Sequence, residues 1–433
     1  MQAAYRNNYR NTRKGLKYFI AIILLLNYFF ISAQTDSVRP GKSIITDSGL
    51  LSRQHDTAFL RRQEDLIDIF LKIIRKDPAI RFEKNKSENL HIHFSGAPSP
   101  SYSLATGIAF NVTGSFAFYV SEDMKTNISS VLLSPIITAK QQLVVPLQFS
   151  IWTKDNKFNI QGDWRFLKYP EATYGLGGTT TDADAVQLDY DQIRVYTFVL
   201  KTLGKNFYAG LGYQYDNHWN IAQLNVPANT VTAFDKYGYS KSSISSGPSV
   251  DLLFDTRTNS LNPEAGSTYA NIVFRQNLHA LGSDANWSSL LIDARKYFHL
   301  SDRSNNILAF WSYNWLTVNG NPPYMDLPST GWDAYSNTGR GYIQSRFRAK
   351  NMVDLESEYR FGIMRNGLLG GVVFANAQAY SESAGNLFKP IIPGWGAGLR
   401  IRFNKFSKTN ICLDYGFGLH GSNGLFVNLG EVF

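Results

Sequence analysis

The chain has 433 residues, a formal charge of +9, 18% charged residues and 14% aromatic residues. This charged fraction is below the roughly 25% of soluble domains, and the single cysteine, Cys412, excludes an intramolecular disulfide and a thiolate metal cluster. Residues 1–33 hold five basic and no acidic side chains, so the high net charge is no argument for nucleic-acid binding.

Residues 1–33 have the order of a secretory signal peptide. Basic side chains precede an apolar run from Tyr18 to Ile31, and the segment ends in small residues at Ala33. The run is shorter than the roughly 20 residues of a membrane-spanning helix. We therefore expect export with cleavage after Ala33, with a membrane-anchoring helix as the alternative.

Residues 34–89 are predicted to form a short periplasmic segment with one amphipathic helix. Asp56 or Thr57 would cap a helix that runs to Lys76. We expect it to pack at the mouth of the following domain; a plug or a docking helix for a partner are the alternatives. Its apolar face would carry Phe59, Leu66, Ile67, Phe70, Ile73 and Ile74.

From residue 90 to residue 433, apolar and polar residues alternate with period two in segments of about ten or more residues. Strands of a soluble sandwich are usually shorter, about five or six residues. In lipid, only helices and closed barrels satisfy every backbone group, and no apolar run here is long enough for a spanning helix. The pattern predicts an all-β protein, a transmembrane antiparallel β-barrel in the outer membrane of a Gram-negative cell.

Sixteen strands are expected in this barrel. The long connections fall on the odd-to-even side, which places them outside the cell and the N-terminus in the periplasm. The expected strands are 90–104, 105–121, 128–140, 141–154, 157–168, 186–203, 206–222, 244–256, 266–280, 287–300, 305–318, 351–363, 367–381, 394–404, 409–419 and 424–433.

Several short motifs lie in characteristic places along these strands and loops. Arg340-Gly341-Tyr342 falls late in the longest outer connection. The others are Tyr174-Gly175-Leu176-Gly177, Asp255-Thr256-Arg257 followed by Pro263 and Gly266, Gly394 to Arg400, Leu413 to Gly416, and Leu429 to Phe433. Together they resemble the BamA/TamA outer-membrane assembly superfamily, also called the bacterial surface antigen family, over residues 90–433. In that family Arg-Gly-Phe/Tyr marks the tip of a sixth outer loop that folds into the lumen.

The resemblance implies that Arg340, Gly341 and Tyr342 lock this loop inside the barrel. A guanidinium in a barrel interior needs carboxylate or amide acceptors. Glu356 and Glu358 share the predicted lumen face of one strand, so we expect them to hold Arg340. Ordinary polar lumen residues are the alternative reading.

Phe374-Ala375-Asn376-Ala377-Gln378 resembles the Phe-x-Asp-x-Gly element of the family. Asn376 replaces the usual Asp and Gln378 replaces Gly. Asn376 is expected to accept a hydrogen bond from Arg340 without charge assistance, so the lock would depend mainly on the glutamates. The terminal Phe433 is expected to act as the signal for barrel insertion.

The resemblance implies a protein that assists insertion or translocation of proteins at the outer membrane, without nucleotide hydrolysis. Strands 90–104 and 424–433 would form a weak seam, since Pro98 and Pro100 cannot donate to a ladder. The family's periplasmic POTRA modules are roughly 75 residues long, so residues 34–89 are too few for a complete one. The alternative is a passive outer-membrane barrel, a pore or membrane anchor that has lost assembly activity.

The expected partners are outer-membrane lipid and unfolded outer-membrane protein clients or assembly subunits. We expect no enzyme activity, no cofactor and no metal site, because the chain lacks a Gly-x-Ser-x-Gly elbow and a cluster with metal-ligand spacing. His91 and His93 alternate on one predicted strand without a third ligand nearby, so they are expected to be lumen or interface residues.

Overall fold

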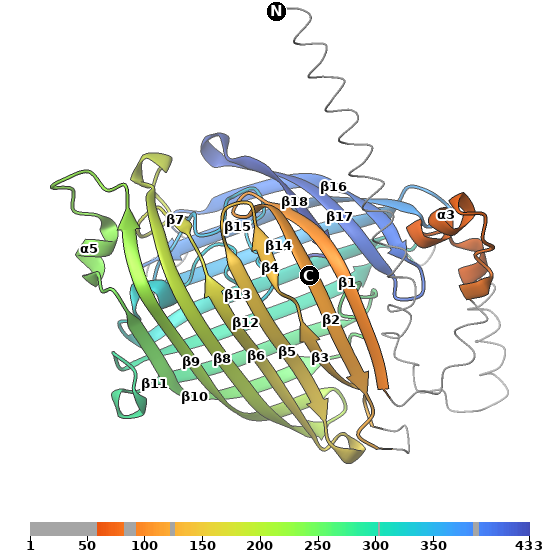
Figure 1. The fold of residues 1–433 in the computed structure, drawn as a ribbon, viewed down its shortest axis with the longest axis horizontal. Coiled ribbons are helices and arrows are strands. Elements are labelled where there is room, and N and C mark those ends of the chain that lie inside the picture. The colour runs from red at the N-terminus through yellow and green to blue at the C-terminus, as the bar shows by residue number, and fades with distance from the viewer. Residues whose placement is uncertain (1–58, 82–91, 122–125, 302–303, 384–388) are drawn as a thin grey trace, which may run out of the picture.

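The computed structural model describes residues 59–81, 92–121, 126–301, 304–383 and 389–433. Most of them form one antiparallel sheet that closes into a barrel (Figure 1). The strands are β1 (Ile92–Ser103), β2 (Gly107–Phe118), β3 (Ser129–Leu133), β4 (Ile136–Thr138), β5 (Leu143–Trp152), β6 (Phe158–Lys168), β7 (Glu171–Thr173), β8 (Val186–Gly204), β9 (Phe207–Leu224), β10 (Ser243–Asp255), β11 (Thr268–Asn277), β12 (Trp287–His299), β13 (Ile307–Gly320), β14 (Asn351–Gly362), β15 (Leu369–Ser381), β16 (Ile392–Asn404), β17 (Thr409–Gly418) and β18 (Asn423–Leu429). The helices are α3 (Leu66–Ile73) and α5 (Ala233–Gly238).

The 18 strand segments correspond to sixteen strands of the barrel wall, because two of these strands are each divided into two segments. β3 and β4 both pair with β2 and β5, and β6 and β7 both pair with β8, so each couple is one interrupted strand. The break between β3 and β4 contains Pro135, whose nitrogen has no hydrogen to donate to the ladder. The predicted sixteen-stranded antiparallel barrel with a short helix before it is confirmed. The expected signal peptide lies outside the described residues.

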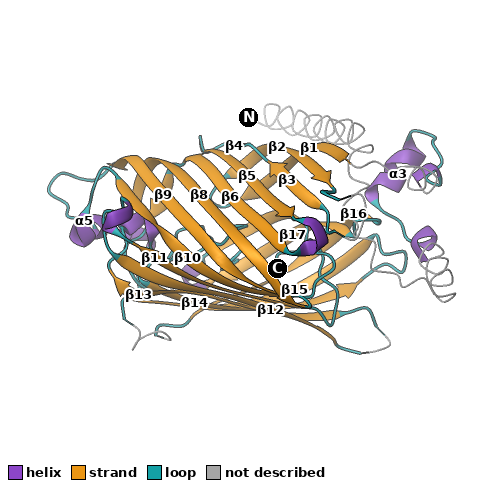
Figure 2. Cartoon of the chain, turned by 90° about the horizontal axis from the view of Figure 1, so that it is seen from below, coloured by secondary structure: helices purple, strands orange, loops and turns teal. Residues whose placement is uncertain are grey.

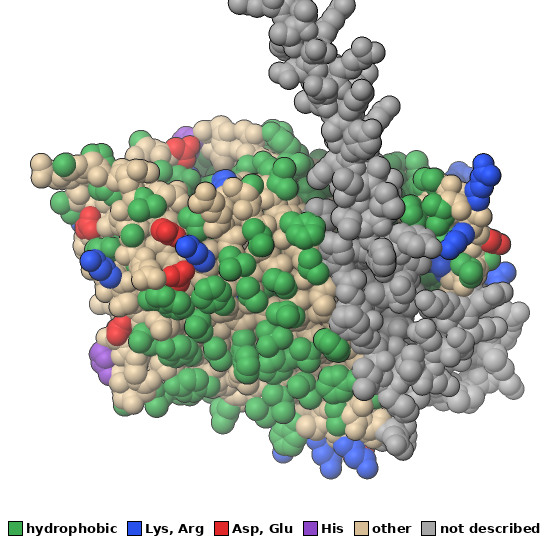
Figure 3. Space-filling model, viewed as in Figure 1, with side chains coloured by type: hydrophobic (Ala, Val, Ile, Leu, Met, Phe, Trp, Pro, Cys, Tyr) green, Lys and Arg blue, Asp and Glu red, His purple; other side chains and the backbone are tan. Residues whose placement is uncertain are grey.

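The apolar face of the strands points outward. In β17, Tyr415 and Phe417 are exposed, whereas Cys412 and Asp414, on the opposite face, are fully buried. Figure 3 shows apolar side chains covering much of the visible wall. In a transmembrane barrel this outward face contacts lipid, so the period-two pattern assigned the two faces correctly.

The two longest connections, residues 225–242 and 321–350, lie at the end of the barrel opposite α3. α5 belongs to the long connection between β9 and β10 and lies at one end, while α3 lies at the other (Figures 1 and 2). Turns at the α3 end include the short one between β8 and β9. Because bacterial barrels have short periplasmic turns, α3 marks the periplasmic end.

The N-terminal helix is shorter than the sequence predicts. It begins at Leu66 instead of near residue 57, because the Asp65 side chain caps it by accepting from the Asp68 N–H at 2.7 Å. Residues 59–62 are also helical but are separated from α3 by three residues. No helix among the described residues is long and apolar enough to cross a bilayer.

Candidate functional site

The connection between β13 and β14, residues 321–350, folds into the barrel, and we call it the lumen loop. Between Tyr324 and Ala349, all of which are described, only residues 334–336 are exposed. Loops of soluble and membrane proteins normally run over the surface. A loop buried to this extent must therefore be held by specific contacts with the wall.

The first contact is made by Arg340, which is 1% exposed. Its Nη2 lies 3.1 Å from Oε2 of Glu356 and 2.6 Å from Oε1 of Glu358, and its Nη1 donates to Oδ2 of Asp414 at 2.8 Å. The guanidinium also lies 3.9 Å from the ring centroid of Phe374. Charge-assisted bonds of this kind are the strongest hydrogen bonds in proteins. We call this group the Arg340 clamp.

Two further arginines surround the clamp. Arg400 pairs with Asp414 and, at 2.7 Å, with Glu431. Arg360 pairs with Glu358 at 2.6 Å. Asp414 and Glu358 therefore each have a second cation besides Arg340, so each of these buried carboxylates is neutralised by more than one arginine.

Gly341 and Tyr342 fix the loop against the last strands. Gly341 has φ +109°, and a Cβ there would lie 2.5 Å from the Phe417 carbonyl oxygen. The Tyr342 hydroxyl donates to the Pro393 carbonyl at 2.6 Å and accepts from the Leu419 N–H at 2.8 Å. The motif thus needs glycine for a close approach, and it needs tyrosine because the hydroxyl reaches both β16 and the turn after β17.

The structure places all the residues that the sequence suggested for this lock in one group, with one difference of contact. Asn376 donates its amide to the Arg340 carbonyl at 2.8 Å instead of accepting from the guanidinium, whose two Nη atoms already contact three carboxylates. The sequence reasoning missed Asp414 as a member of the clamp and Arg400 as its neighbour. Their position on the polar face of their strands was the available signal.

A second anchor joins the lumen loop to β7. Nη2 of Arg348 lies 3.4 Å from Oε1 of Glu171, and the Ser345 hydroxyl donates to Oε2 of the same carboxylate. The Tyr190 hydroxyl donates to Oε1 at 3.2 Å. All four groups are buried or nearly so, so this carboxylate is satisfied only when the loop is inside.

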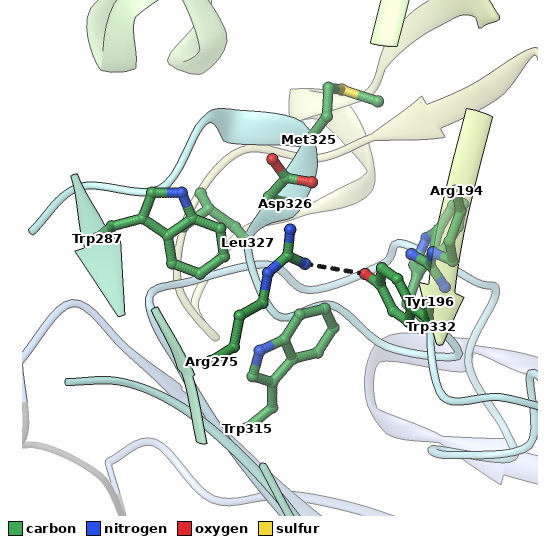
Figure 4. Close-up of a pocket in the computed structure, with 9 residues that line it drawn as sticks. All are labelled: Arg194, Tyr196, Arg275, Trp287, Trp315, Met325, Asp326, Leu327 and Trp332. Carbon is green, nitrogen blue, oxygen red and sulfur yellow. Dashed lines mark hydrogen bonds between the residues drawn. The ribbon is translucent and has the colours of Figure 1, made fainter. Parts of the chain in front are cut away.

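A third anchor involves Asp326, whose surroundings in the lumen are drawn in Figure 4. The Ser245 hydroxyl donates to Asp326 of the lumen loop at 2.6 Å. Arg275 lies beside it, donates to the Tyr196 hydroxyl at 3.1 Å and stacks on Trp287. The cavity between these side chains is about 10 Å³, which is room for one water at most. The loop therefore fills this part of the lumen.

The C-terminal residues leave the wall and turn inward. β18 ends at Leu429 instead of continuing to the last residue, and Phe433 is 1% exposed. Its ring lies 5.3 Å from that of Trp311, and its main-chain oxygen accepts from Arg360 at 2.8 Å. Phe433 thus lies in the interior, and its role as an insertion signal stays a prediction.

The first and last strands meet over a short distance. Within the described residues they share one paired position, Tyr102 with Val427, whereas β1 and β2 pair along all of β1. The chain leaves the wall at Gly430, with φ +93°, where the Cys412 thiol donates to the Gly430 carbonyl at 3.0 Å. The periplasmic part of the β1 edge therefore has no paired strand among the described residues.

No group of three or more His, Cys, Asp or Glu side chains among the described residues could hold a metal ion. His91 lies outside the described residues, and His93 is described only through its backbone pairing with Ala117.

No protein-family model matches the sequence, and no curated protein matches it. Solved structures do match the fold. The chain is similar to BamA from Haemophilus ducreyi lacking POTRA domains 1–3, with TM-score 0.52 and 15% identity over 78% of this chain and 69% of that one. It is also similar to CdiB from Escherichia coli, with TM-score 0.52 and 10% identity over 79% of this chain and 63% of that one.

CdiB from Acinetobacter baumannii matches with TM-score 0.50 and 12% identity, over 79% of this chain and 60% of that one. The fold is that of an outer-membrane β-barrel. At these identities the likeness concerns the fold alone, and the chain spans less than two thirds of either CdiB chain.

Proposed function

We propose that this protein assists insertion or translocation of proteins at the outer membrane. The observation that carries the proposal is the short seam: among the described residues, β1 has one paired position with β18, and its edge toward the periplasm has no partner strand. An unpaired edge presents backbone N–H and C=O groups to an incoming strand, which can add to the sheet by β-augmentation. The assembly role implied by the resemblance in sequence requires an edge of this kind.

The filled lumen argues against an open pore. The lumen loop buries Arg340, Tyr342 and Phe347 against the wall, and the tail buries Phe433 beside them. A diffusion pore needs a continuous wet channel, whereas this interior is packed with apolar side chains on the side of β12 to β16. A passive membrane anchor without catalytic chemistry is the remaining alternative, and we likewise propose that the protein is not an enzyme.

Locking the seam tests the proposal. Tyr102→Cys and Val427→Cys, in a Cys412→Ser background, place two thiols at the paired position. The matched control places a thiol pair at Leu211 and Val250, which are partners in the long β9–β10 ladder. The amounts of other outer-membrane and surface proteins are then followed in cells with and without oxidant.

The seam disulfide should lower those amounts, while the control disulfide should leave them unchanged. A seam disulfide that forms in folded protein without any effect on other membrane proteins would favour the passive anchor.

A further inference from the structure

A buried cluster of charged side chains holds residues 59–81 at the periplasmic end of the barrel. We call residues 59–81 the rim segment. Nη1 of Arg81 lies 2.7 Å from both Asp65 and Asp68. Lys405, in the turn between β16 and β17, lies 2.7 Å from Asp68 and donates its backbone N–H to Asp65 at 2.7 Å. Two acids and two bases thus neutralise each other, and the segment is held in one place on the rim.

The rim segment leaves three large apolar side chains exposed. Phe59, Ile73 and Ile80 are 53%, 65% and 56% exposed. α3 buries Ile67 and Leu71, whereas Ile73 of the same helix points into solvent. The described residues do not cover these three apolar side chains, which therefore remain available to an apolar environment outside the chain.

Basic side chains surround these apolar ones. Outside the buried cluster, the segment has five exposed basic residues against Asp77 and the half-buried Glu64, a formal excess of three positive charges. Glu64 is itself paired with Lys72. The space-filling view shows basic side chains beside apolar ones at this end of the molecule (Figure 3). The basic residues are Arg61, Arg62, Lys72, Arg75 and Lys76.

The rim segment adjoins the lipid-facing wall. Its Glu64 N–H donates to the Asn366 carbonyl at 2.9 Å, in the turn between β14 and β15. This turn begins with Ile363, which is 50% exposed and continues the outward row of Phe361 and Tyr359. The apolar surface of the segment is therefore close to the surface that contacts lipid.

From these features we propose that the rim segment binds the periplasmic leaflet of the outer membrane, with its basic residues on anionic phospholipid headgroups. Phe59, Ile73 and Ile80 enter the boundary between headgroups and acyl chains. Apolar side chains flanked by Lys and Arg are the pattern of interfacial membrane anchors. Anionic lipid attracts each basic residue near the surface only weakly, so several basic residues are needed together.

Cysteine accessibility in lipid nanodiscs tests this binding. Ile73→Cys and Ile80→Cys are made separately in a Cys412→Ser background, and the protein is reconstituted at one copy per disc, which excludes a second copy as the cover. The discs contain phosphatidylcholine with or without phosphatidylglycerol, and a charged maleimide is the probe. Leu399→Cys gives the lipid-facing reference and Lys408→Cys, in an exposed periplasmic turn, gives the aqueous reference.

With phosphatidylglycerol present, the thiols at 73 and 80 should react about tenfold more slowly than the thiol at 408, and close to the rate at 399. Changing Arg61, Arg62 and Arg75 to Gln should remove most of the protection. Reaction as fast as at 408 overturns the proposal and points to a periplasmic protein as the partner. Protection that is equal without phosphatidylglycerol and in the triple Gln variant overturns the role of anionic lipid.

Discussion

Arg340→Met should release the lumen loop. Arg340 faces three carboxylates, but Glu358 retains Arg360 and Asp414 retains Arg400. Only Glu356 loses its cation, and it keeps one hydrogen bond, from the Gly339 N–H at 2.9 Å. Breaking a buried ion pair costs about 3–5 kcal/mol of stability. Because Glu356 keeps one hydrogen-bond donor, we expect a cost at the lower end of this range, about 3 kcal/mol.

A loss of about 3 kcal/mol raises the fraction of molecules with the loop outside by roughly 10²-fold. The reporter is Ser329→Cys, a loop position that is 1% exposed, in a Cys412→Ser background. Its reaction with a hydrophilic maleimide should accelerate by that factor, because labelling follows the open fraction when opening is fast. The heat-modifiable mobility of the variant, compared between heated and unheated samples on denaturing gels, checks that the barrel stays folded.

The companion variant is Arg340→Met with Glu356→Gln. It also removes the negative charge that Arg340→Met leaves unpaired at position 356. The labelling rate should therefore return toward the wild-type rate, since a buried neutral amide costs far less than a buried unpaired carboxylate. If Arg340→Met alone labels at the wild-type rate, or if adding Glu356→Gln gives no recovery, the clamp does not hold the loop as argued.

Three further outcomes are expected. Phe433→Ala should lower the free energy of unfolding by about 3–5 kcal/mol in denaturant titrations, since its ring is enclosed beside Trp311; a change below about 1 kcal/mol would contradict interior packing. Arg81→Met should detach the rim segment at a cost of about 3 kcal/mol, seen as faster proteolysis there; an unchanged rate would refute it. Hydrogen bonds from Thr232 lower the pKa of Asp235, so this cap of α5 is complete above the ordinary carboxyl range and is lost as pH falls through the lowered pKa. Proteolysis of the α5 loop should therefore rise only in acid, and Asp235→Asn should remove that dependence.

Much of the fold could be predicted because a barrel wall is a local pattern. Alternation with period two assigned Tyr415 to lipid and Asp414 to the interior without any knowledge of partners. The interruptions within strands were harder to predict from the sequence. Pro135 interrupts a strand whose neighbours bridge it on both sides, and this bridging is a property of the sheet, not of the segment.

The site was predictable only in part for a similar reason. Glu356 and Glu358 lie on one strand, so their common direction follows from spacing. Asp414 and Arg400 come from two later strands, and their meeting with Arg340 depends on how far the lumen loop descends. The inward turn at Gly430 depends on the interior rings that receive Phe433, which no local pattern reveals.

The position of Cys412 gives this protein a native chemical probe. Its thiol is 1% exposed and donates to the Gly430 carbonyl, at the point where the chain leaves the wall. Any motion that draws the tail out breaks this bond and uncovers the sulfur. The alkylation rate of Cys412 in the unmodified protein therefore reports how often residues 430–433 leave the barrel interior. This measurement can be made in living cells and needs no engineered label.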